Sequence, residues 1–220
     1  MIHPIVTLNG NFGVVLEQVL PDDLDDPVFR ARAYDLWFAH GGLLAVRGER
    51  LADLSPEKLM EWAENFGAVE QKTQAGREDK TVPGFPILRI GNICHPDGTP
   101  AAQFSNVPQL SSDDDIRYNP RTRRPVWHTD STFRKNPPIG SVFHCRSAPP
   151  NGAETLFADM QKAYNALPED ERRKLDGLEA ICSLAHHDKK INSYSPEYPV
   201  LTPEQRAANP LRRVPLALRH

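Results

Sequence analysis

The residue types best suited to metal chemistry stand together in the segment Trp127-His128-Thr129-Asp130. Side chains at positions i and i+2 of a β-strand point to the same side of that strand, so a strand here would aim the imidazole of His128 and the carboxylate of Asp130 at one point. Two histidines and one carboxylate form the facial triad that holds non-haem iron(II) and leaves positions open for a cosubstrate and O2. The pair supplies two of those three ligands.

The His-x-Asp spacing is weak evidence by itself, because it also occurs at residues 95–97 and 186–188. Residues 95–97 form part of a His-Pro-Asp-Gly sequence that is typical of a turn. Residues 186–188 continue into two lysines with no strand pattern. Only His128 and Asp130 have the apolar and aromatic neighbours expected of a strand. On spacing alone, a structural pairing or a solvent-facing strand end is the commoner explanation.

The elements that must position this pair are predicted from apolar periodicity and from prolines. Strands are predicted at 12–20, 43–48, 87–92, 126–133, 140–147 and 154–159. Helices are predicted from Pro27 to Gly41, from Ser55 to Gly67, at 159–166 and at 168–182. The long segment 93–124 carries an acidic run and a basic cluster, which indicates either a lid or binding loop or a solvated surface.

The composition predicts a soluble domain and restricts the partners that it could bind. The 220 residues carry a net charge of −3, which gives no electrostatic reason to expect nucleic acid or a membrane surface as partner. No apolar stretch is long enough to span a bilayer, and the N-terminus does not resemble a signal peptide. Three scattered cysteines argue against a disulfide framework and favour a reducing cytoplasm. The oligomeric state is open, and a homo-oligomer is one option.

Residues 126–178 closely resemble the taurine dioxygenase (TauD/TfdA) family, which includes chlorophenoxyacetate dioxygenases. The shared pattern is W-H-[ST]-D, then a proline-containing turn, a strand that ends in P-P-x-G-G-[DE]-T, and A-[DN]-M-x-x-A-Y-x-A-L-P. Residues 43–70 resemble the family's earlier strand–helix–F-G-x-[LV]-E segment. The resemblance covers about residues 12–220. It implies a double-stranded β-helix, an Fe(II) cofactor and 2-oxoglutarate as cosubstrate.

The family's site residues carry over at three positions. His128 and Asp130 match the first two iron ligands, and Thr155 matches the threonine that hydrogen-bonds 2-oxoglutarate. Residues 152–153 are Gly-Ala where the family has Gly-Gly. Arg124 stands where several family members carry an asparagine that lines the substrate pocket. It suits an anionic substrate by bidentate pairing, and a solvent-facing loop residue is an equal alternative.

The fold class expected is β-rich α+β, a cupin-like jelly roll with N-terminal helices that is truncated before the barrel is complete. We expect one domain over residues 1–220, with residues 1–85 as the N-terminal helix and strand part and residues 86–220 as the first half of the jelly roll. The resemblance places the second iron histidine and an arginine for 2-oxoglutarate beyond His220. His220 itself does not match the distal ligand, and His144 is expected to be a packed or hydrogen-bonded strand residue.

The function implied is an Fe(II)- and 2-oxoglutarate-dependent dioxygenase that hydroxylates a small, anionic organic substrate and releases succinate and CO2. We expect the natural protein to continue beyond His220 and the 220-residue chain alone to have little activity. One alternative is a cupin isomerase or a dioxygenase without cosubstrate, although Thr155 would then have no role. The other is a non-catalytic binding protein on a degenerate jelly roll.

Overall fold

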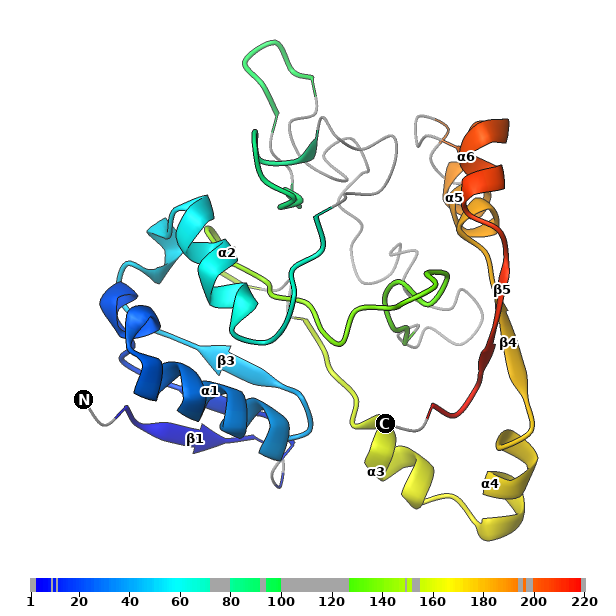
Figure 1. Ribbon diagram of the computed structural model, residues 1–220, viewed down its shortest axis with the longest axis horizontal. Coiled ribbons are helices and arrows are strands. Elements are labelled where there is room, and N and C mark those ends of the chain that lie inside the picture. Colours follow the sequence, from blue (N-terminus) through cyan, green and yellow to red (C-terminus); the bar gives the residue numbers. More distant parts are fainter. Residues whose placement is uncertain are drawn as a thin grey trace. The chain divides into compact units, whose positions relative to one another are not determined.

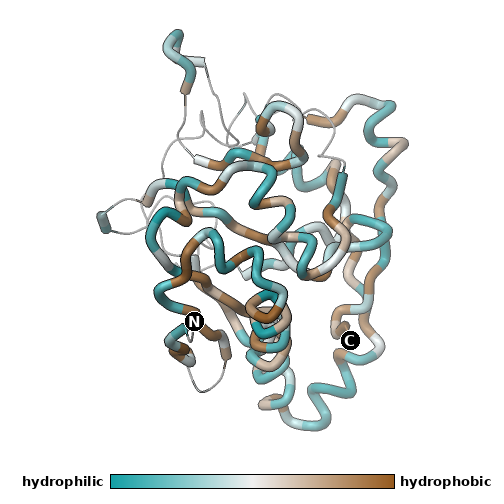
Figure 2. Tube along the Cα trace, turned by 60° about the vertical axis from the view of Figure 1, so that its left-hand side comes forward, coloured by the Kyte–Doolittle hydropathy of each residue, from teal (hydrophilic) through white to brown (hydrophobic). Residues whose placement is uncertain are grey.

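The computed structural model describes residues 3–8, 10, 12–71, 80–91, 94–99, 127–148, 150–151, 155–193, 196 and 200–218. Hydrophilic and hydrophobic residues are interspersed along the described chain (Figure 2). No helix within these ranges is long and apolar enough to cross a membrane. In chain order the elements are β1 (Ile5–Thr7), β2 (Val14–Leu16), the 3-10 helix η2 (Pro21–Asp25), α1 (Pro27–Ala39), β3 (Leu44–Val46), the 3-10 helix η3 (Leu51–Asp53), α2 (Pro56–Glu64), α3 (Met160–Asn165), α4 (Glu169–Leu175), β4 (Glu179–Cys182), α5 (Leu184–Asn192), α6 (Pro203–Ala208) and β5 (Arg212–Pro215) (Figure 1).

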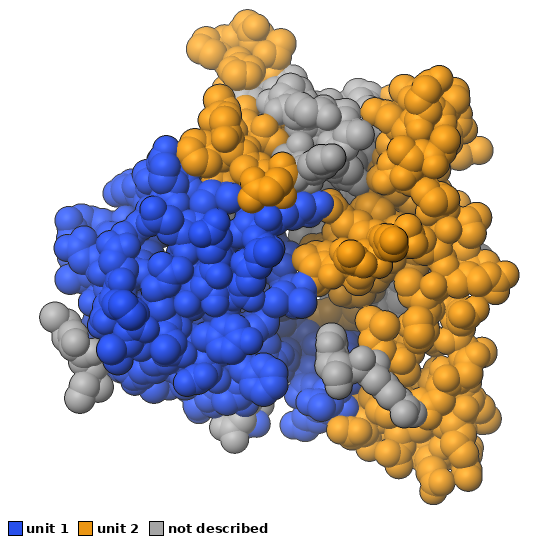
Figure 3. All heavy atoms as spheres, in the orientation of Figure 1, with its two compact units in different colours: residues 1–70, 139–162 blue, residues 71–138, 163–220 orange. Residues whose placement is uncertain are grey.

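The chain divides into two compact units, and each is described by itself. Unit 1 comprises Met1–Glu70 and Ile139–Lys162, and unit 2 comprises Gln71–Pro138 and Ala163–His220 (Figure 3). Unit 1 is therefore built from two stretches that are far apart in the sequence. The single domain over residues 1–220, with its division at residue 85, stays a prediction.

Unit 1 contains a three-stranded sheet in the order β1-β2-β3. β1 and β2 are antiparallel, whereas β2 and β3 are parallel with Val14 opposite Leu44. Parallel neighbours need a crossover connection, and α1 provides it. The side chain of Asp26 caps α1 by accepting a hydrogen bond from the backbone N–H of Val28, and Pro27 takes the first helical position.

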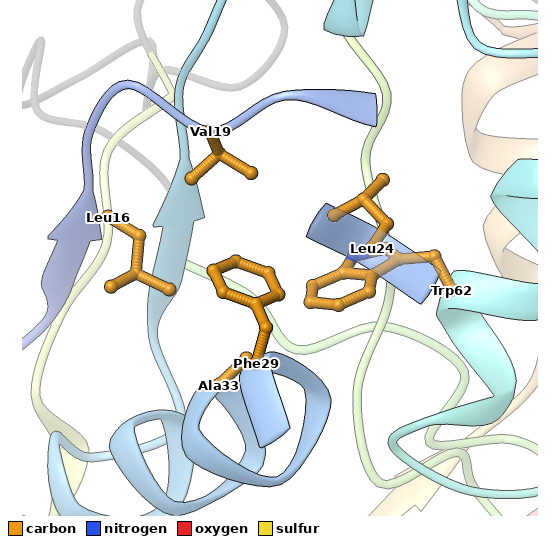
Figure 4. Close-up of a cluster of buried hydrophobic side chains, with 6 residues drawn as sticks. All are labelled: Leu16, Val19, Leu24, Phe29, Ala33 and Trp62. Atoms are coloured by element: carbon orange, nitrogen blue, oxygen red, sulfur yellow. The ribbon is translucent and has the colours of Figure 1, made fainter. Parts of the chain in front are cut away.

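The core of unit 1 lies between the sheet and its helices. Its buried members come from β2, the segment after it, η2, α1 and α2; they are Leu16, Val19, Leu24, Phe29, Ala33 and Trp62 (Figure 4). The rings of Phe29 and Trp62 have centroids 6.0 Å apart, and Phe66 lies edge-on to Trp62 at 5.3 Å. Such aromatic pairs bury large areas, so they hold α1 and α2 together by the hydrophobic effect.

A polar clamp joins the same two helical segments. The side-chain amide of Asn65 donates to the backbone carbonyl of Arg30 at 3.0 Å, and the Arg30 guanidinium donates to the Asn65 side-chain oxygen at 3.5 Å. The Arg30 guanidinium also donates to the Glu61 carbonyl at 2.7 Å. The clamp fixes how the end of α2 meets the start of α1.

We expect Asn65→Ala to lower the free energy of unfolding of unit 1 by about 1–2 kcal/mol, because a partly buried carbonyl loses its donor. Asn65→Asp keeps the oxygen that accepts from Arg30 and loses only the donor, so it should cost less. Chemical denaturation followed by tryptophan fluorescence measures both. Equal stability of wild type and Asn65→Ala would show that the clamp contributes nothing.

Unit 2 contains an antiparallel ribbon of β4 and β5, with Glu179 opposite Pro215 and Cys182 opposite Arg212. Its helices begin at side-chain caps. Ser183 accepts from the backbone N–H of His186 at the start of α5, and Thr202 accepts from that of Gln205 at the start of α6. These caps satisfy backbone donors that a helix leaves without partners in its first turn.

The structure corrects several predicted elements. The described residues of 87–92, 126–133, 140–147 and 154–159 contain no strand, and residue 88 forms only an isolated bridge with residue 81. The helix predicted at 168–182 ends at Leu175, and Glu179–Cys182 is the strand β4. The described residues of these segments form isolated bridges at most and no β ladder, and Phe143 is 67 % exposed. An apolar run becomes a strand only when a neighbour completes its hydrogen bonds.

Candidate metal centre

The segment that carries His128 and Asp130 is not a strand: residues 127–129 belong to no helix or strand, and Asp130 begins a turn. Residues 130–133 are in turn conformation, and the backbone N–H of Arg134 donates to the carbonyl of Ser131 at 2.9 Å. Ser131 has a φ of +60°, in the left-handed region. The guanidinium of Arg134 lies over the ring of Phe133, 5.9 Å from its centroid, and burial lowers the pKa of Arg134. The alternation of a strand therefore does not aim the two candidate ligands.

The two candidate ligands nevertheless lie close together. The Nε2 of His128 lies 3.4 Å from the Oδ1 of Asp130. Two donor atoms bound to one metal at about 2.1 Å each, and roughly at right angles, are about 3 Å apart. The observed separation fits two neighbouring ligands of one ion after a small adjustment. The side chains are 68 % and 60 % exposed, so an ion can reach both.

The described residues hold no third ligand for this pair. Among them, no group of three or more His, Cys, Asp or Glu side chains could hold a metal ion. Thr155 is described in unit 1 as an exposed residue outside any strand, and its contact with 2-oxoglutarate stays a prediction. Arg124, residues 152–153 and His220 lie outside the described residues. The structure thus brings together two of the predicted site residues, His128 and Asp130.

The other two His-x-Asp sequences have structural roles. Asp97 forms a turn in which its Oδ1 accepts from both the backbone N–H and the hydroxyl of Thr99, at 2.9 and 2.7 Å. Asp188 lies on α5, where its buried carboxylate is 3.0 Å from the Nδ1 of His187. The turn expected at residues 95–97 and the absence of a strand at residues 186–188 are confirmed, whereas the strand expected around His128 and Asp130 is not found.

The turn at Asp97 gives a pH-dependent prediction. The hydroxyl of Thr99, followed by its backbone N–H, lowers the pKa of Asp97 from its model-compound value of 3.8. A carboxyl group whose pKa is lower in the folded state stabilises that state above its ordinary pKa, and the stabilisation disappears as the pH falls through the lowered value. We expect Thr99→Val to move the Asp97 pKa back toward the ordinary value, as measured by NMR titration. An unchanged pKa would contradict the hydrogen bond.

His144 and His3 are both engaged in unit 1. The Nε2 of His144 lies 2.6 Å from the carbonyl oxygen of Leu51, which confirms the expected hydrogen-bonded histidine, although no strand carries it. His3 is 3 % exposed, lies edge-on to Phe29, and has its Nε2 3.6 Å from the carboxylate of Asp23. Both imidazoles therefore have structural partners in unit 1.

Comparison with known proteins identifies the family. The family described as "Taurine catabolism dioxygenase TauD, TfdA family" matches residues 5–219, so the chain belongs to it. A curated relative, the (S)-phenoxypropionate/alpha-ketoglutarate-dioxygenase of Sphingobium herbicidovorans, is 30% identical over 85% of this chain and 55% of its own length. The alpha-ketoglutarate-dependent 2,4-dichlorophenoxyacetate dioxygenase of Cupriavidus pinatubonensis is 29% identical over 63% of this chain and 44% of its own length.

A third curated relative comes from a fungus. The alpha-ketoglutarate-dependent sulfonate dioxygenase of Saccharomyces cerevisiae is 27% identical over 80% of this chain and 38% of its own length. The chain spans about half the length of the curated relatives that it matches. No solved structure matches it. The family implies a cupin-like jelly roll, whereas the described residues form two small sheets and helices without a closed barrel.

Proposed function

We propose that the whole protein is an Fe(II)- and 2-oxoglutarate-dependent dioxygenase that hydroxylates a small organic substrate. The observation that carries this proposal is the 3.4 Å approach of the His128 imidazole to the Asp130 carboxylate, in a chain that belongs to the TauD/TfdA family. The curated relatives reported above are all named as alpha-ketoglutarate-dependent or alpha-ketoglutarate dioxygenases. The donor set of one imidazole and one carboxylate is the part of a facial triad that suits iron(II).

In this proposal His128 and Asp130 bind the metal side by side, and Thr155 donates its hydroxyl proton to a carboxylate oxygen of 2-oxoglutarate. When bound, iron(II) and 2-oxoglutarate supply the oxidising chemistry, in which 2-oxoglutarate and O2 yield succinate and CO2 and the substrate gains a hydroxyl group. The protein's contribution is to hold the donors in place and to orient the cosubstrate.

The substrate class that we propose is a small organic anion. Phenoxypropionate, dichlorophenoxyacetate and sulfonate, the compounds in the relatives' names, all carry an acidic group. Arg124 is the candidate partner for such a group, because a guanidinium can bind a carboxylate or sulfonate through two parallel hydrogen bonds. O2 and 2-oxoglutarate complete the set of small-molecule partners. We propose a cytoplasmic location, since all three cysteines are free.

The first test is an anaerobic visible difference spectrum on adding Fe(II) and then 2-oxoglutarate to the protein encoded by the whole reading frame. We expect a weak charge-transfer band that His128→Ala removes. If the protein encoded by the whole reading frame shows no band, the proposed iron site is wrong. A non-catalytic binding protein then becomes the better explanation.

A further inference from the structure

The strand β1 lies at an edge of the sheet in unit 1, with β2 as its single strand neighbour among the described residues. Hydrogen bonds join the two strands at both ends of β1. The backbone N–H of Glu17 donates to the carbonyl of Pro4 at 3.0 Å, and the backbone N–H of Leu8 donates to the carbonyl of Gly13 at 2.9 Å. Successive residues of an antiparallel strand direct their backbone groups alternately to its two sides. Even-numbered residues along β1 therefore face β2, and odd-numbered residues face outward.

The outward backbone groups of β1 belong to Ile5 and Thr7. In the part of the chain that the structure describes, these groups have no hydrogen-bond partner. An edge of this kind is a template for another strand, and proteins commonly block such edges with charged residues or proline. Residues 3–16 contain no Lys, Arg, Asp or Glu, and Pro4 lacks its N–H on the side that faces β2. The outer edge of β1 is therefore not blocked in either way.

The side chains along this edge are apolar and accessible. Ile5, Val6 and Leu8 are 42 %, 47 % and 37 % exposed, although the neighbouring strand β2 is buried throughout. A single exposed apolar residue is normal on a protein surface, whereas a contiguous group of them marks an interaction site. A partner strand would cover these side chains and satisfy the outward backbone groups at the same time.

We propose that the outer edge of β1 is a dimer interface, at which a second copy of the protein pairs with it in antiparallel orientation. The two-fold axis lies at Val6, so Ile5 of each copy exchanges both backbone hydrogen bonds with Thr7 of the other. A two-fold interface brings each patch against itself, so a charged residue near the axis would meet its like. The uncharged sequence of β1 avoids this repulsion, which favours a second copy as the occupant.

The size of the edge sets the expected strength of the dimer. Interfaces of stable complexes bury about 1,200–2,000 Å² in total, and two three-residue strands bury less than that. We therefore expect a weak dimer whose population rises with protein concentration. The inference does not depend on the proposed function, because no metal or cosubstrate takes part in the interface.

The test is analytical ultracentrifugation of the protein encoded by the whole reading frame over a series of concentrations. We expect the mean mass of the wild type to rise from that of one chain toward that of two. Val6→Lys should weaken the dimer by at least about tenfold, because two ammonium groups would meet at the axis. Val28→Lys is the matched control, since Val28 lies on α1 and is 75 % exposed, and it should leave the dimer unchanged.

Two further measurements identify the edge and the occupant. Thr7→Pro removes one outward N–H, and proline is tolerated on the outer side of an edge strand, so this variant should lose the dimer while its circular dichroism stays that of the wild type. A mixture of Val6→Lys and Val6→Glu should associate, although each variant alone does not, because opposite charges then meet at the axis. Only pairing between two copies at this residue predicts that rescue.

Three results would overturn the inference. A wild-type mass that stays at one chain at every concentration would show that the edge of β1 binds no second copy. Dimers of Val6→Lys and Thr7→Pro that are as tight as the wild-type dimer would place the interface on another surface. A mixture of Val6→Lys and Val6→Glu that remains monomeric would exclude the two-fold pairing at Val6.

Discussion

Asp130→Ala should abolish succinate formation in the protein encoded by the whole reading frame. The substitution removes one of the two donors that lie 3.4 Å apart, so the metal would be left with a single ligand from this segment. Removing groups that only orient metal ligands costs about 10- to 100-fold, and the loss of a direct ligand should exceed that. We therefore expect turnover to fall by more than about 100-fold. Succinate produced per minute with saturating Fe(II) and 2-oxoglutarate is the measurement.

The control for this experiment is Asp35→Ala, which removes an exposed carboxylate on α1 in unit 1. It changes the net charge by the same amount and should leave turnover within about twofold, since surface substitutions have small effects. Asp130→Ala must also retain the circular dichroism signal of the wild-type helices. This would show that the loss of turnover comes from the missing carboxylate and not from unfolding. Turnover that survives in Asp130→Ala would exclude this aspartate as an iron ligand.

Gly48→Ala should destabilise unit 1 more than any other glycine-to-alanine change among the described glycines. A Cβ at Gly48 would lie 1.7 Å from the carbonyl oxygen of Val19, well inside the closest approach of two such atoms. Val19 is fully buried in the core, and its backbone N–H donates a hydrogen bond to the carbonyl of Arg47. The backbone of Val19 therefore cannot move away freely. We expect the free energy of unfolding to fall by about 3 kcal/mol or more, at the upper end of overpacking effects.

Gly140→Ala is the matched control for this prediction within the same unit. Its Cβ would meet only a ring carbon of Trp37 at 3.6 Å, which is ordinary van der Waals contact, and its φ is not positive. It should be close to neutral or slightly stabilising, since alanine restricts the unfolded chain more than glycine does. Denaturant titrations of the two variants compare them directly. Equal stabilities would mean that Val19 and Gly48 do not approach closely in solution.

The N-terminal helices were predictable because their beginnings depend on local chemistry. Pro27 at the first helical position lacks the N–H that would need a partner, and Ser55 caps α2 by accepting from the backbone N–H of Lys58. The strands at 12–20 and 43–48 were also found, as β2 and β3. They pair with each other, and the helix between them is the connection that parallel neighbours require.

The strands predicted after residue 85 failed because a strand depends on partners that the local sequence does not reveal. The segment 140–147 was predicted to be a strand, but its described residues form no β ladder. Its His144 side chain instead forms a hydrogen bond with the carbonyl of Leu51. The ribbon of β4 and β5 was missed for the complementary reason. Its residues Arg212–Pro215 are polar and proline-containing, and only pairing with Glu179–Cys182 makes them a strand.

The structure places His128 and Asp130 3.4 Å apart, while their role as metal ligands stays a prediction. The geometry arises differently from the one predicted, since no strand carries the pair. Nothing in the residue type at position 131 indicated a positive φ, because serine is common in ordinary turns. A glycine or asparagine there would have been a recognisable signal. The sequence could therefore indicate the pair of side chains, but not the backbone conformation of the residues that follow it.

The bond between His144 and Leu51 joins residues that are 93 positions apart in the sequence, within one compact unit. A ribosome adds about 5–20 residues per second, so the N-terminal sheet and helices emerge roughly 5–20 s before this partner exists. During that interval the first 70 residues of unit 1 carry exposed surface that the later stretch will contact. Slow steps of this kind favour chaperone binding during synthesis. Unit 1 should therefore finish folding late on the ribosome, although its first strands are made first.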